Sequence, residues 1–239
     1  MESVICITGA SQGIGRALAT YFSDRGHHVF NLDIKRPADG SNSFETSLLD
    51  ITDEEACGRI LDSIGQSHGR LDVLINCASI FSTLTMKPFW EIESSDWDQV
   101  INVNLKGTFN TCKKALPWLK KSSTGRIINF SSAVVPMGRP NYLHYVSSKA
   151  GVQGLSRAMA REVGDFNITV NAILPGATVT EVARETVSPE QMKAMIQSRC
   201  IKRPQEVSDL TGVVGFLCSK EADFITGQSF VVDGGLTVT

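Results

Sequence analysis

The sequence predicts an α/β fold with a doubly wound parallel sheet that is covered by helices on both faces. Short apolar runs alternate along the whole chain with longer segments in which apolar residues recur at the helical period. The runs are nearly continuous in Val, Ile and Leu, which is the pattern of parallel strands buried on both faces. Strands and helices that alternate in this way are joined by right-handed crossovers into one layered sheet.

The expected strands are six apolar runs. In chain order they are VICIT at 4–8, HVFNLD at 28–33, LDVLIN at 71–76, RIINFS at 126–131, ITVNAIL at 168–174 and SFVVD at 229–233. Two of the segments between them show a clear apolar helical face. The first face consists of Ile14, Ala17, Leu18, Tyr21 and Phe22, and the second of Val152, Leu155, Met159 and Val163.

Length and composition predict one domain that spans residues 1–239. The chain is 42% hydrophobic with a formal net charge of −2, which argues against disorder and against a nucleic-acid or anionic-membrane partner. Six scattered cysteines without a CxxC pair favour a reduced, cytoplasmic protein over a metal site or a disulfide framework. The first apolar run is too short for a signal peptide or a membrane span.

Residues 177–204 depart from the regular alternation. They carry few apolar anchors and contain a Ser-Pro break at Ser188 and Pro189. Long excursions of this kind in compact domains often cover an active site. We therefore expect a mobile substrate flap with one short helix.

A glycine-rich turn, TGASQGIG at 8–15, follows the first strand and opens the first helix. Such a turn brings backbone close to a ligand and offers the N–H groups of a helix N-terminus to a pyrophosphate. By itself it is a weak signal, because many similar turns are only tight connections. Asp33 strengthens the signal, since an acid at the end of the second strand can accept both hydroxyls of an adenosine ribose. NAD(H) is therefore favoured, although Lys35 and Arg36 could receive the 2′-phosphate of NADP(H).

Two later motifs, YVSSK at 145–149 and VVDGG at 231–235, complete a family pattern. Together with TGASQGIG they resemble the short-chain dehydrogenase/reductase family in its compact single-domain branch. The likeness covers nearly the whole chain, with the motifs in the expected order and spacing. It implies a Rossmann fold with a mostly seven-stranded sheet and a nicotinamide cofactor. No metal site is expected, because His27, His28 and His68 form no cluster with carboxylates in the sequence.

The resemblance also implies which residues bind the cofactor. Gln12 stands where many NADP-preferring members have Arg or Lys, which again favours NAD. Cys77 and Ser79 depart from the family's usual Asn-Asn-Ala-Gly at 76–79. The positions that match are Gly9, Ser11, Gly13, Ile14 and Gly15 in the dinucleotide turn, Asp50 and Ile51 at the adenine, Asn76 and Ala78 at the end of the third run, and Pro175, Gly176, Thr178 and Thr180 at the carboxamide.

Tyr145 and Lys149 are candidate catalytic residues that also contact the cofactor. At i and i+4 on one helix they share a face, and a fixed ammonium favours the phenolate of a tyrosine whose ordinary pKa is about 10. Such a phenol can give a proton to a carbonyl oxygen or take one from an alcohol. By resemblance, Ser132 holds the substrate oxygen and Asn104 anchors a water that relays protons through Lys149.

Two other polar residues lie close to Tyr145 in the sequence. Tyr142 is about two helical turns from Lys149, too far to be tuned by it, and either lines the pocket or packs at the helix entry. His144 points away from the face of Tyr145, which favours packing or capping over a substrate contact.

The favoured function is hydride transfer between a nicotinamide and a secondary alcohol or ketone. The alternatives are a catalytically silent dinucleotide-binding sensor or scaffold, and a reductase or isomerase of carbon–carbon double bonds. The expected pocket walls mix apolar side chains with Arg139, Asn141 and Ser82, which suits a ketone with polar decoration. By resemblance, long helices around 104–122 and 145–164 pair subunits into a homotetramer or homodimer.

Overall fold

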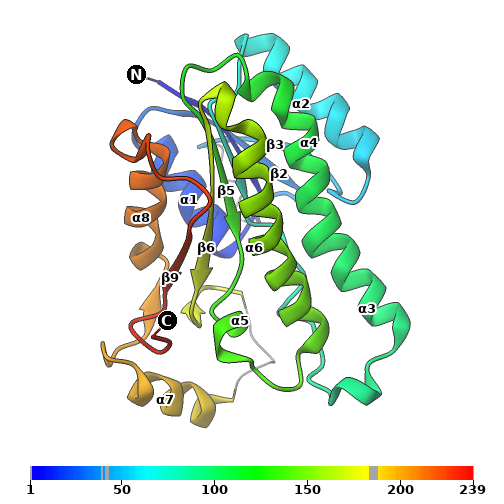
Figure 1. The fold of residues 1–239 in the computed structure, drawn as a ribbon, viewed down its shortest axis with the longest axis vertical. Helices are drawn as coiled ribbons and strands as arrows, with labels where there is room; N and C mark the ends of the chain where they lie inside the picture. The colour runs from blue at the N-terminus through cyan, green and yellow to red at the C-terminus, as the bar shows by residue number, and fades with distance from the viewer. Residues whose placement is uncertain (1, 39, 41–42, 183–187, 239) are drawn as a thin grey trace.

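The computed structural model describes residues 2–38, 40, 43–182 and 188–238 (Figure 1). Its centre is a seven-stranded sheet in the order β3-β2-β1-β4-β5-β6-β9, with parallel pairing throughout. The strands are β1 (Val4–Thr8), β2 (His28–Asp33), β3 (Glu45–Leu48), β4 (Val73–Asn76), β5 (Gly125–Phe130), β6 (Ile168–Pro175) and β9 (Ser229–Val232). The predicted doubly wound, mostly seven-stranded parallel sheet is confirmed.

Each of the six apolar runs contains a strand, whereas β3 was not expected. Glu45–Leu48 reads ETSL, without the β-branched apolar run that marks the other strands. It lies at the edge of the sheet and pairs only with β2, so its side chains need no burial on both faces. Two of its four residues are exposed and none is buried, which explains the missing sequence signal.

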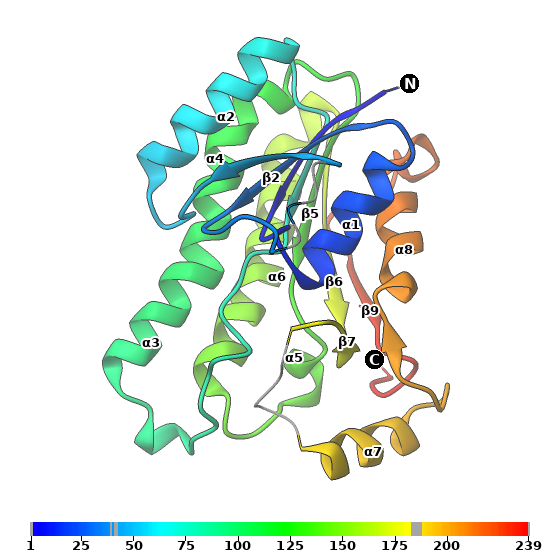
Figure 2. The ribbon, with the colours of Figure 1, turned by 180° about the vertical axis from the view of Figure 1, so that it is seen from behind.

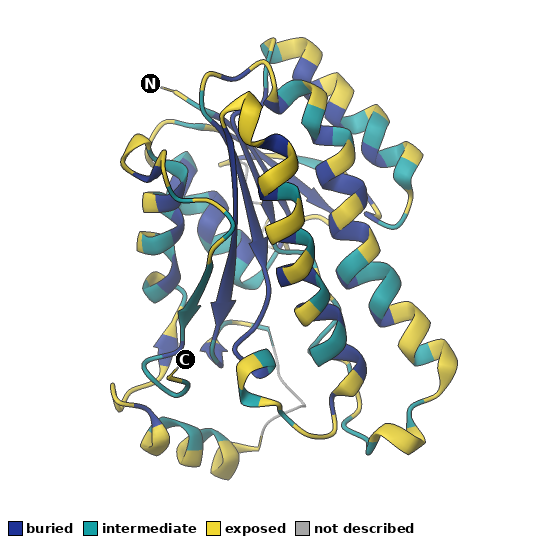
Figure 3. Cartoon of the chain, in the orientation of Figure 1, coloured by how far each residue is buried: buried dark blue, intermediate teal, exposed yellow. Residues whose placement is uncertain are grey.

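Helices cover both faces of the sheet (Figures 1 and 2). On one face the apolar residues of α2 (Glu54–His68), α4 (Thr108–Leu119) and α6 (Leu143–Val163) pack against the strands. On the other face α1 (Gly13–Ser23) and α8 (Ser208–Cys218) do the same. The central strands are dark blue and the outer helix faces are largely yellow in Figure 3, as expected for a sheet enclosed between two helical layers.

Shorter elements lie mainly at the connections. The described residues between β6 and α8 include a short helix and two two-residue strands that pair with each other. Residues 183–187 of the expected flap lie outside the described residues, and its role as a mobile flap stays a prediction. The described elements are α3 (Ser94–Ile101), a π-helix (Asn102–Gly107), α5 (Val134–Met137), α7 (Pro189–Ser198), β7 (Thr178–Val179), β8 (Gln205–Glu206) and 3₁₀ turns at Phe89–Glu91, Gly164–Phe166 and Lys220–Ala222. No described helix has the length and apolarity to cross a membrane.

Buried polar side chains join the middle strands to the helical layer. Asn76 of β4 donates to the Oδ1 atom of Asn129 on β5 at 2.8 Å. Asn129 in turn donates to the Ser156 Oγ atom of α6 at 2.9 Å, and Thr111 of α4 donates to the Oδ1 atom of Asn76 at 2.7 Å. Because all four residues are buried, each needs these partners, and the network holds α4 and α6 in register with the sheet.

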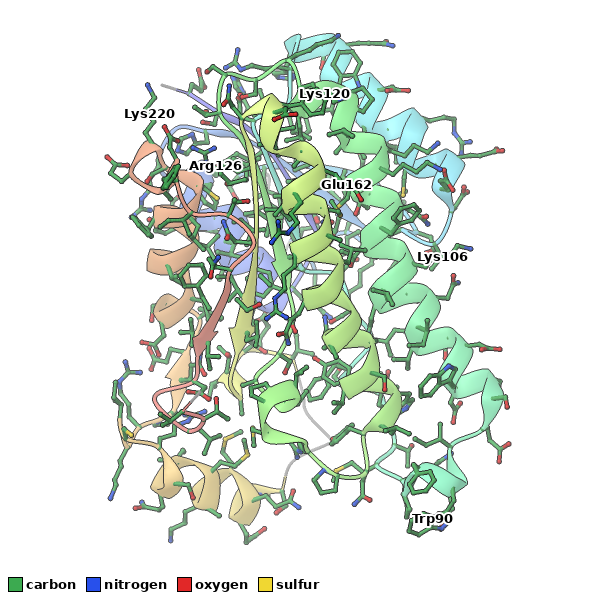
Figure 4. All side chains as sticks on the ribbon, viewed as in Figure 1. Trp90, Lys106, Lys120, Arg126, Glu162 and Lys220 are labelled. Carbon is green, nitrogen blue, oxygen red and sulfur yellow. The ribbon has the colours of Figure 1, made fainter. Side chains whose placement is uncertain are left out.

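The strand order reverses between β1 and β4, so connections leave in opposite directions at that point. In open α/β sheets, ligands bind at the carboxyl edge beside such a switch point. In Figure 2 this edge is the lower one, where α5, β7 and α7 are labelled. Arg126 is labelled at the opposite end of the sheet in Figure 4. It forms an ion pair with Asp223 there, away from the carboxyl edge where ligands bind.

Two glycines of α2 provide a test of the packing between α2 and α4. Glycine in a helix interior costs about 1 kcal/mol relative to alanine. A Cβ atom at Gly65 would lie 2.0 Å from the Cδ2 atom of the Trp118 ring, whereas at Gly58 the nearest atom is the Cδ atom of Lys114 at 3.5 Å. We expect Gly65→Ala to lower the free energy of unfolding by about 1–2 kcal/mol because overpacking outweighs the gain in propensity.

Gly58→Ala is the matched control and should raise the free energy of unfolding by about 0.5–1 kcal/mol. Urea unfolding of both variants, followed by circular dichroism, measures the difference. Equal effects of the two substitutions would contradict the close approach of the two helices at Gly65.

Candidate active site

The carboxyl ends of β5 and β6 and the first turns of α6 enclose a cavity of about 130 Å³. Ser132, Tyr145 and Lys149 all line it, so three of the four predicted catalytic residues meet at one place. Ile14 of the glycine turn and Pro175 of the β6 end line it as well. Its other lining residues are Cys77, Ser79, Phe81, Phe130, Ser131, Ala133, Val134, Met137, Arg139, Gly176, Ala177, Met195 and Leu236.

Lys149 is a buried cation at the base of this cavity. Only 3% of the residue is exposed, and its Nζ atom donates a hydrogen bond to the carbonyl oxygen of Phe130 at 2.9 Å. The same Nζ atom lies 5.7 Å from the centroid of the Tyr145 ring. Burial lowers the pKa of Lys149 to about 8, because the charged form loses solvation. The amine is therefore mainly protonated at pH 7 and can exchange protons near neutrality.

Tyr145 is held by aromatic packing and by its own helix. Its ring centroid lies 4.7 Å from that of Phe81 and 6.4 Å from that of Tyr142. Ser148, three residues later, donates from its Oγ atom to the carbonyl oxygen of Tyr145 at 2.7 Å. These contacts limit the motion of the phenol, and a fixed phenol is what proton transfer requires.

Tyr142 and His144 take structural positions beside Tyr145. Tyr142 is fully buried, stacks near the Phe81 ring and is not among the residues that line the cavity. His144 is 3% exposed, and its Nδ1 atom has no hydrogen-bond partner among the described residues. Burial lowers the pKa of His144, so the neutral imidazole is favoured there. Both positions agree with packing at the start of α6.

The two serines at the end of β5 have different surroundings. The Ser131 hydroxyl donates to the carbonyl oxygen of Lys149 at 2.8 Å and accepts a hydrogen bond from Gln153. The Ser132 Oγ atom accepts the backbone N–H of Val134 at 3.3 Å, which leaves its own proton for another acceptor. Ser131 thus anchors α6 to the sheet, and Ser132 is the serine that can donate into the cavity.

Asn104 lies within the π-helix and does not line the cavity. Its Oδ1 atom accepts the backbone N–H of Ile80 at 2.8 Å, and its Nδ2 atom donates to the Ile80 carbonyl oxygen and to the Ser148 Oγ atom, both at 3.2 Å. The side chain therefore connects the segment after β4 to the Tyr145 helix. Single π-turns inside helices are frequent at functional sites. The predicted role of Asn104 in proton relay stays a prediction.

The glycine turn is shaped for an anion. Gly9 and Gly13 have φ values of 72° and 61°, which residues with a Cβ atom rarely adopt. A Cβ atom at Gly15 would lie 2.4 Å from the Gly9 carbonyl oxygen. The N–H of Gly13 donates to a carboxylate oxygen of Glu181 at 2.8 Å, so a negatively charged oxygen already sits at the N-terminus of α1. The turn therefore fits the pyrophosphate of a dinucleotide.

Asp33 ends β2 close to this turn. It is 8% exposed, and its two carboxylate oxygens accept the backbone N–H groups of Ser11 and Lys35 at 3.0 and 3.2 Å. Each oxygen retains a lone pair for a further donor such as a ribose hydroxyl. The Lys35 Nζ atom donates to the Gln12 side chain at 2.6 Å, which keeps a cation beside the same turn.

Comparisons with known proteins agree with this geometry. A family model described as "Enoyl-(Acyl carrier protein) reductase" matches residues 9–237. The 3-oxoacyl-[acyl-carrier-protein] reductase FabG of Thermotoga maritima is 35% identical over 252 residues, which cover 100% of this chain and 99% of the relative. FabG of Staphylococcus aureus is 36% identical over 250 residues, covering 99% and 98%. The chain belongs to the short-chain dehydrogenase/reductase family.

Solved structures show the same relation. The ligand-free aldohexose dehydrogenase of Thermoplasma acidophilum superimposes with a TM-score of 0.91 at 30% identity. The superposition covers 98% of this chain and 94% of the dehydrogenase chain. A short-chain type dehydrogenase/reductase from Mycobacterium ulcerans gives a TM-score of 0.91 at 27% identity, with coverage of 99% and 90%.

Three other positions that match the family, Asn76, Ala78 and Asp50, have different surroundings in the structure. The Asn76 side chain is committed to Asn129 and Thr111 inside the protein, so it does not project from the sheet edge. Ala78 packs against Gly9, where a Cβ atom would lie 2.7 Å from the Ala78 Cα atom. The Asp50 side chain accepts from both the backbone N–H and the hydroxyl of Thr52.

The remaining matches concern the expected adenine and carboxamide positions. Ile51 is buried against Gly107 of the π-helix, whereas Asp50 beside it is exposed. Thr178 is buried and donates from its hydroxyl to the Gly176 carbonyl oxygen at 3.2 Å. The hydroxyl of Thr180 accepts the backbone N–H of Val182 at 3.3 Å.

Cys77, which replaces the second Asn of the family pattern, lies beneath the glycine turn. The backbone of Gly15 forms a hydrogen bond with it, and Lys149 is close enough to favour its thiolate, yet burial raises the pKa of the Cys77 thiol to about 12. A protonated thiol at this pKa is a packing group and a poor nucleophile. No cluster of His, Cys, Asp or Glu in the described parts of the chain could hold a metal ion.

Two contributors to the site were not expected from the sequence. Ser148 joins Asn104 to the Tyr145 helix, and Glu181 reaches the glycine turn from 168 residues away. Only Ser148 carried a local signal, because it lies within one turn of Tyr145 on α6. The Glu181 contact arises from a loop whose position depends on the assembled sheet.

The buried amine of Lys149 provides a test by pH. Its folded-state pKa of about 8 lies below the ordinary 10.5, so between these values the unfolded chain binds more protons than the folded one. Stability of the wild-type protein therefore rises with pH across this window, and below pH 8 the cost of burying the charge is fully present. We expect Lys149→Met to remove this rise, which amounts to about 1–3 kcal/mol.

Urea unfolding of the cofactor-free proteins at about pH 7.5 and about pH 10 measures the rise. Other alkali-titrating groups are present in both proteins, so the difference between variant and wild type isolates Lys149. An identical pH dependence in the two proteins would contradict a lowered pKa.

Proposed function

We propose that this protein is an NAD(P)-dependent oxidoreductase that transfers a hydride between a nicotinamide and a secondary alcohol or ketone. The observation that carries the proposal is the meeting of Ser132, Tyr145 and Lys149 at one cavity beside an anion-binding glycine turn. Family membership supports an oxidoreductase with a nicotinamide cofactor.

The side chains have separable roles in the proposed reaction. A bound nicotinamide supplies or accepts the hydride. Ser132 donates a hydrogen bond from its hydroxyl to the substrate oxygen, keeps its own proton and fixes the position of that oxygen. Tyr145 gives a proton to the developing alkoxide during reduction, or removes one from the alcohol during oxidation. Lys149 lies close enough to stabilise the phenolate and exchanges its proton near neutral pH because its pKa is lowered to about 8.

Cofactor binding is proposed to involve the glycine turn, Asp33 and the β6 end. NAD(H) is favoured because the carboxylate of Asp33 would repel a 2′-phosphate while its free lone pairs accept ribose hydroxyls. Gln12 stands beside this site as a neutral side chain. The cations of Lys35 and Arg36 are the features that support NADP(H) instead.

The cavity supports a ketone with a mainly apolar body. Phe81, Val134 and Met137 supply apolar walls, and Arg139 contributes a guanidinium whose Cζ atom lies 4.9 Å from the Tyr142 ring centroid. A carbonyl compound with a polar or anionic substituent fits this mixture. The curated relatives are named as 3-oxoacyl-[acyl-carrier-protein] reductases, which makes a 3-oxoacyl thioester a second candidate substrate.

Two other functions have less support. A silent dinucleotide-binding scaffold has no need for a buried lysine beneath a tyrosine, and both are present with Ser132 and Asn104. Reduction or isomerisation of a carbon–carbon double bond uses the same fold, and the matching family model carries an enoyl reductase description. Ser132 can donate a hydrogen bond to a carbonyl oxygen, which favours reduction of a ketone over chemistry at a carbon–carbon double bond.

Assembly and location are proposed as well. An exposed Phe109 on α4 and an exposed Leu143 at the start of α6 support pairing through these helices in a homotetramer or homodimer. The six free cysteines suit a reducing cytoplasm.

Tyr145→Phe tests the acid–base assignment. We expect kcat with a panel of secondary alcohols and ketones to fall by at least about 100-fold, because the group that transfers the proton to or from the substrate oxygen is removed. NADH should still bind, since the ring keeps its packing. Nicotinamide absorbance measures turnover and fluorescence measures binding. Retained turnover would remove Tyr145 from the mechanism.

Cofactor preference tests the role of Asp33. We expect kcat/KM to be at least about tenfold higher with NADH than with NADPH, since a 2′-phosphate near a carboxylate loses about 1.4 kcal/mol or more. Steady-state rates with both cofactors on one ketone provide the measurement. Comparable values would show that Lys35 and Arg36 outweigh the carboxylate.

A further inference from the structure

The N-terminus of α1 receives its anion from a distant part of the chain. The Oε1 atom of Glu181 accepts the N–H of Gly13 at 2.8 Å. The next residue packs against the same turn, because the Cγ2 atom of Val182 lies 3.5 Å from the position of a Cβ atom at Gly13. The segment that follows β7 therefore rests on the first turn of α1.

Helix α1 lacks the local groups that usually satisfy a helix N-terminus. Its N-cap residue Gln12 makes no side-chain capping bond, and its first turn contains no acidic residue. Helix α2 is the contrast, because Asp53 caps it and Glu54 and Glu55 lie in its first turn. Exposed N–H groups and the helix dipole make such an end attractive to a carboxylate, and Glu181 supplies it.

The same N–H group belongs to the turn that the proposed function assigns to the cofactor's pyrophosphate. Two anionic groups at one helix N-terminus compete for its N–H groups and repel each other. We propose that Glu181 is an internal competitor of the cofactor, whose carboxylate leaves the α1 N-terminus when the pyrophosphate binds there. This inference rests on the proposed function and adds a regulation of the same site.

The position of Glu181 connects the two ends of the cofactor site. It follows Thr178 and Thr180, which are expected to hold the nicotinamide carboxamide, by one to three residues. Release of the carboxylate from Gly13 therefore removes one contact between this segment and α1, while Thr178 stays in β7, paired with β8. The Glu181 carboxylate loses its stabilisation at the helix N-terminus when the cofactor binds. This loss lowers the affinity for the cofactor by about two- to thirtyfold, the range for a charge at a helix N-terminus.

Glu181→Gln tests the competition, because it removes the charge and keeps an oxygen that can accept a hydrogen bond. We expect the dissociation constants of NADH and of ADP-ribose, which contains the pyrophosphate, to fall by about two- to thirtyfold. The dissociation constant of adenosine, which has no phosphate, should stay within about twofold of the wild-type value. Glu181→Ala, which lacks the acceptor oxygen as well, should bind ADP-ribose at least as tightly as Glu181→Gln. Isothermal titration calorimetry measures all three ligands.

Glu206→Gln is the matched control, because it removes the same charge from an exposed position on β8. It should leave all three dissociation constants unchanged. Equal affinity of wild type and Glu181→Gln for ADP-ribose would overturn the competition while leaving the proposed function intact, and so would a parallel gain for adenosine. A wild-type protein that binds none of NADH, NADPH and ADP-ribose would overturn both proposals.

Discussion

The buried ammonium of Lys149 is the constraint on which the rest of the site depends. A charge removed from water needs a fixed polar partner, and the Phe130 carbonyl oxygen at 2.9 Å is that partner. The contact exists only when α6 is docked on the end of β5, so the hydrogen bond from Ser131 to the Lys149 carbonyl oxygen serves the same purpose. Once α6 is docked, Tyr145, which lies one helical turn before Lys149, lines the cavity.

The second requirement is that this helix and the glycine turn face the same cavity. The reversal of strand order between β1 and β4 places the α1 N-terminus next to the end of β4, where Cys77 lies near both Gly15 and Lys149. The network of Asn76, Asn129, Thr111 and Ser156 keeps the middle strands and helices aligned just behind this point. An anion site and a proton-transfer site are thereby held on one rigid sheet edge, which suits hydride transfer between two bound molecules.

Sequence patterns predicted the elements with strong local signals and missed those without them. The six apolar runs became strands because burial on both faces demands continuous apolar residues. Strand β3 was missed because an edge strand with ETSL needs no such run. The π-helix at Asn102–Gly107 was missed because its sequence has a helical period, and only packing against neighbouring elements widens the turn. The proton relay expected of Asn104 through a water stays a prediction, and the structure shows its side chain hydrogen-bonded to Ile80 and Ser148.

The sequence by itself determined the fold class, the glycine turn and the pairing of Tyr145 with Lys149, because each rests on a repeat or a spacing within a few residues. Only the tertiary structure decided which groups surround them. Phe130 presents its carbonyl oxygen to Lys149, Phe81 packs on Tyr145, and Glu181 binds Gly13 from far along the chain. The physical reason is that such contacts form between loops and strand ends, whose meeting depends on the order of strands in the sheet and on no local pattern.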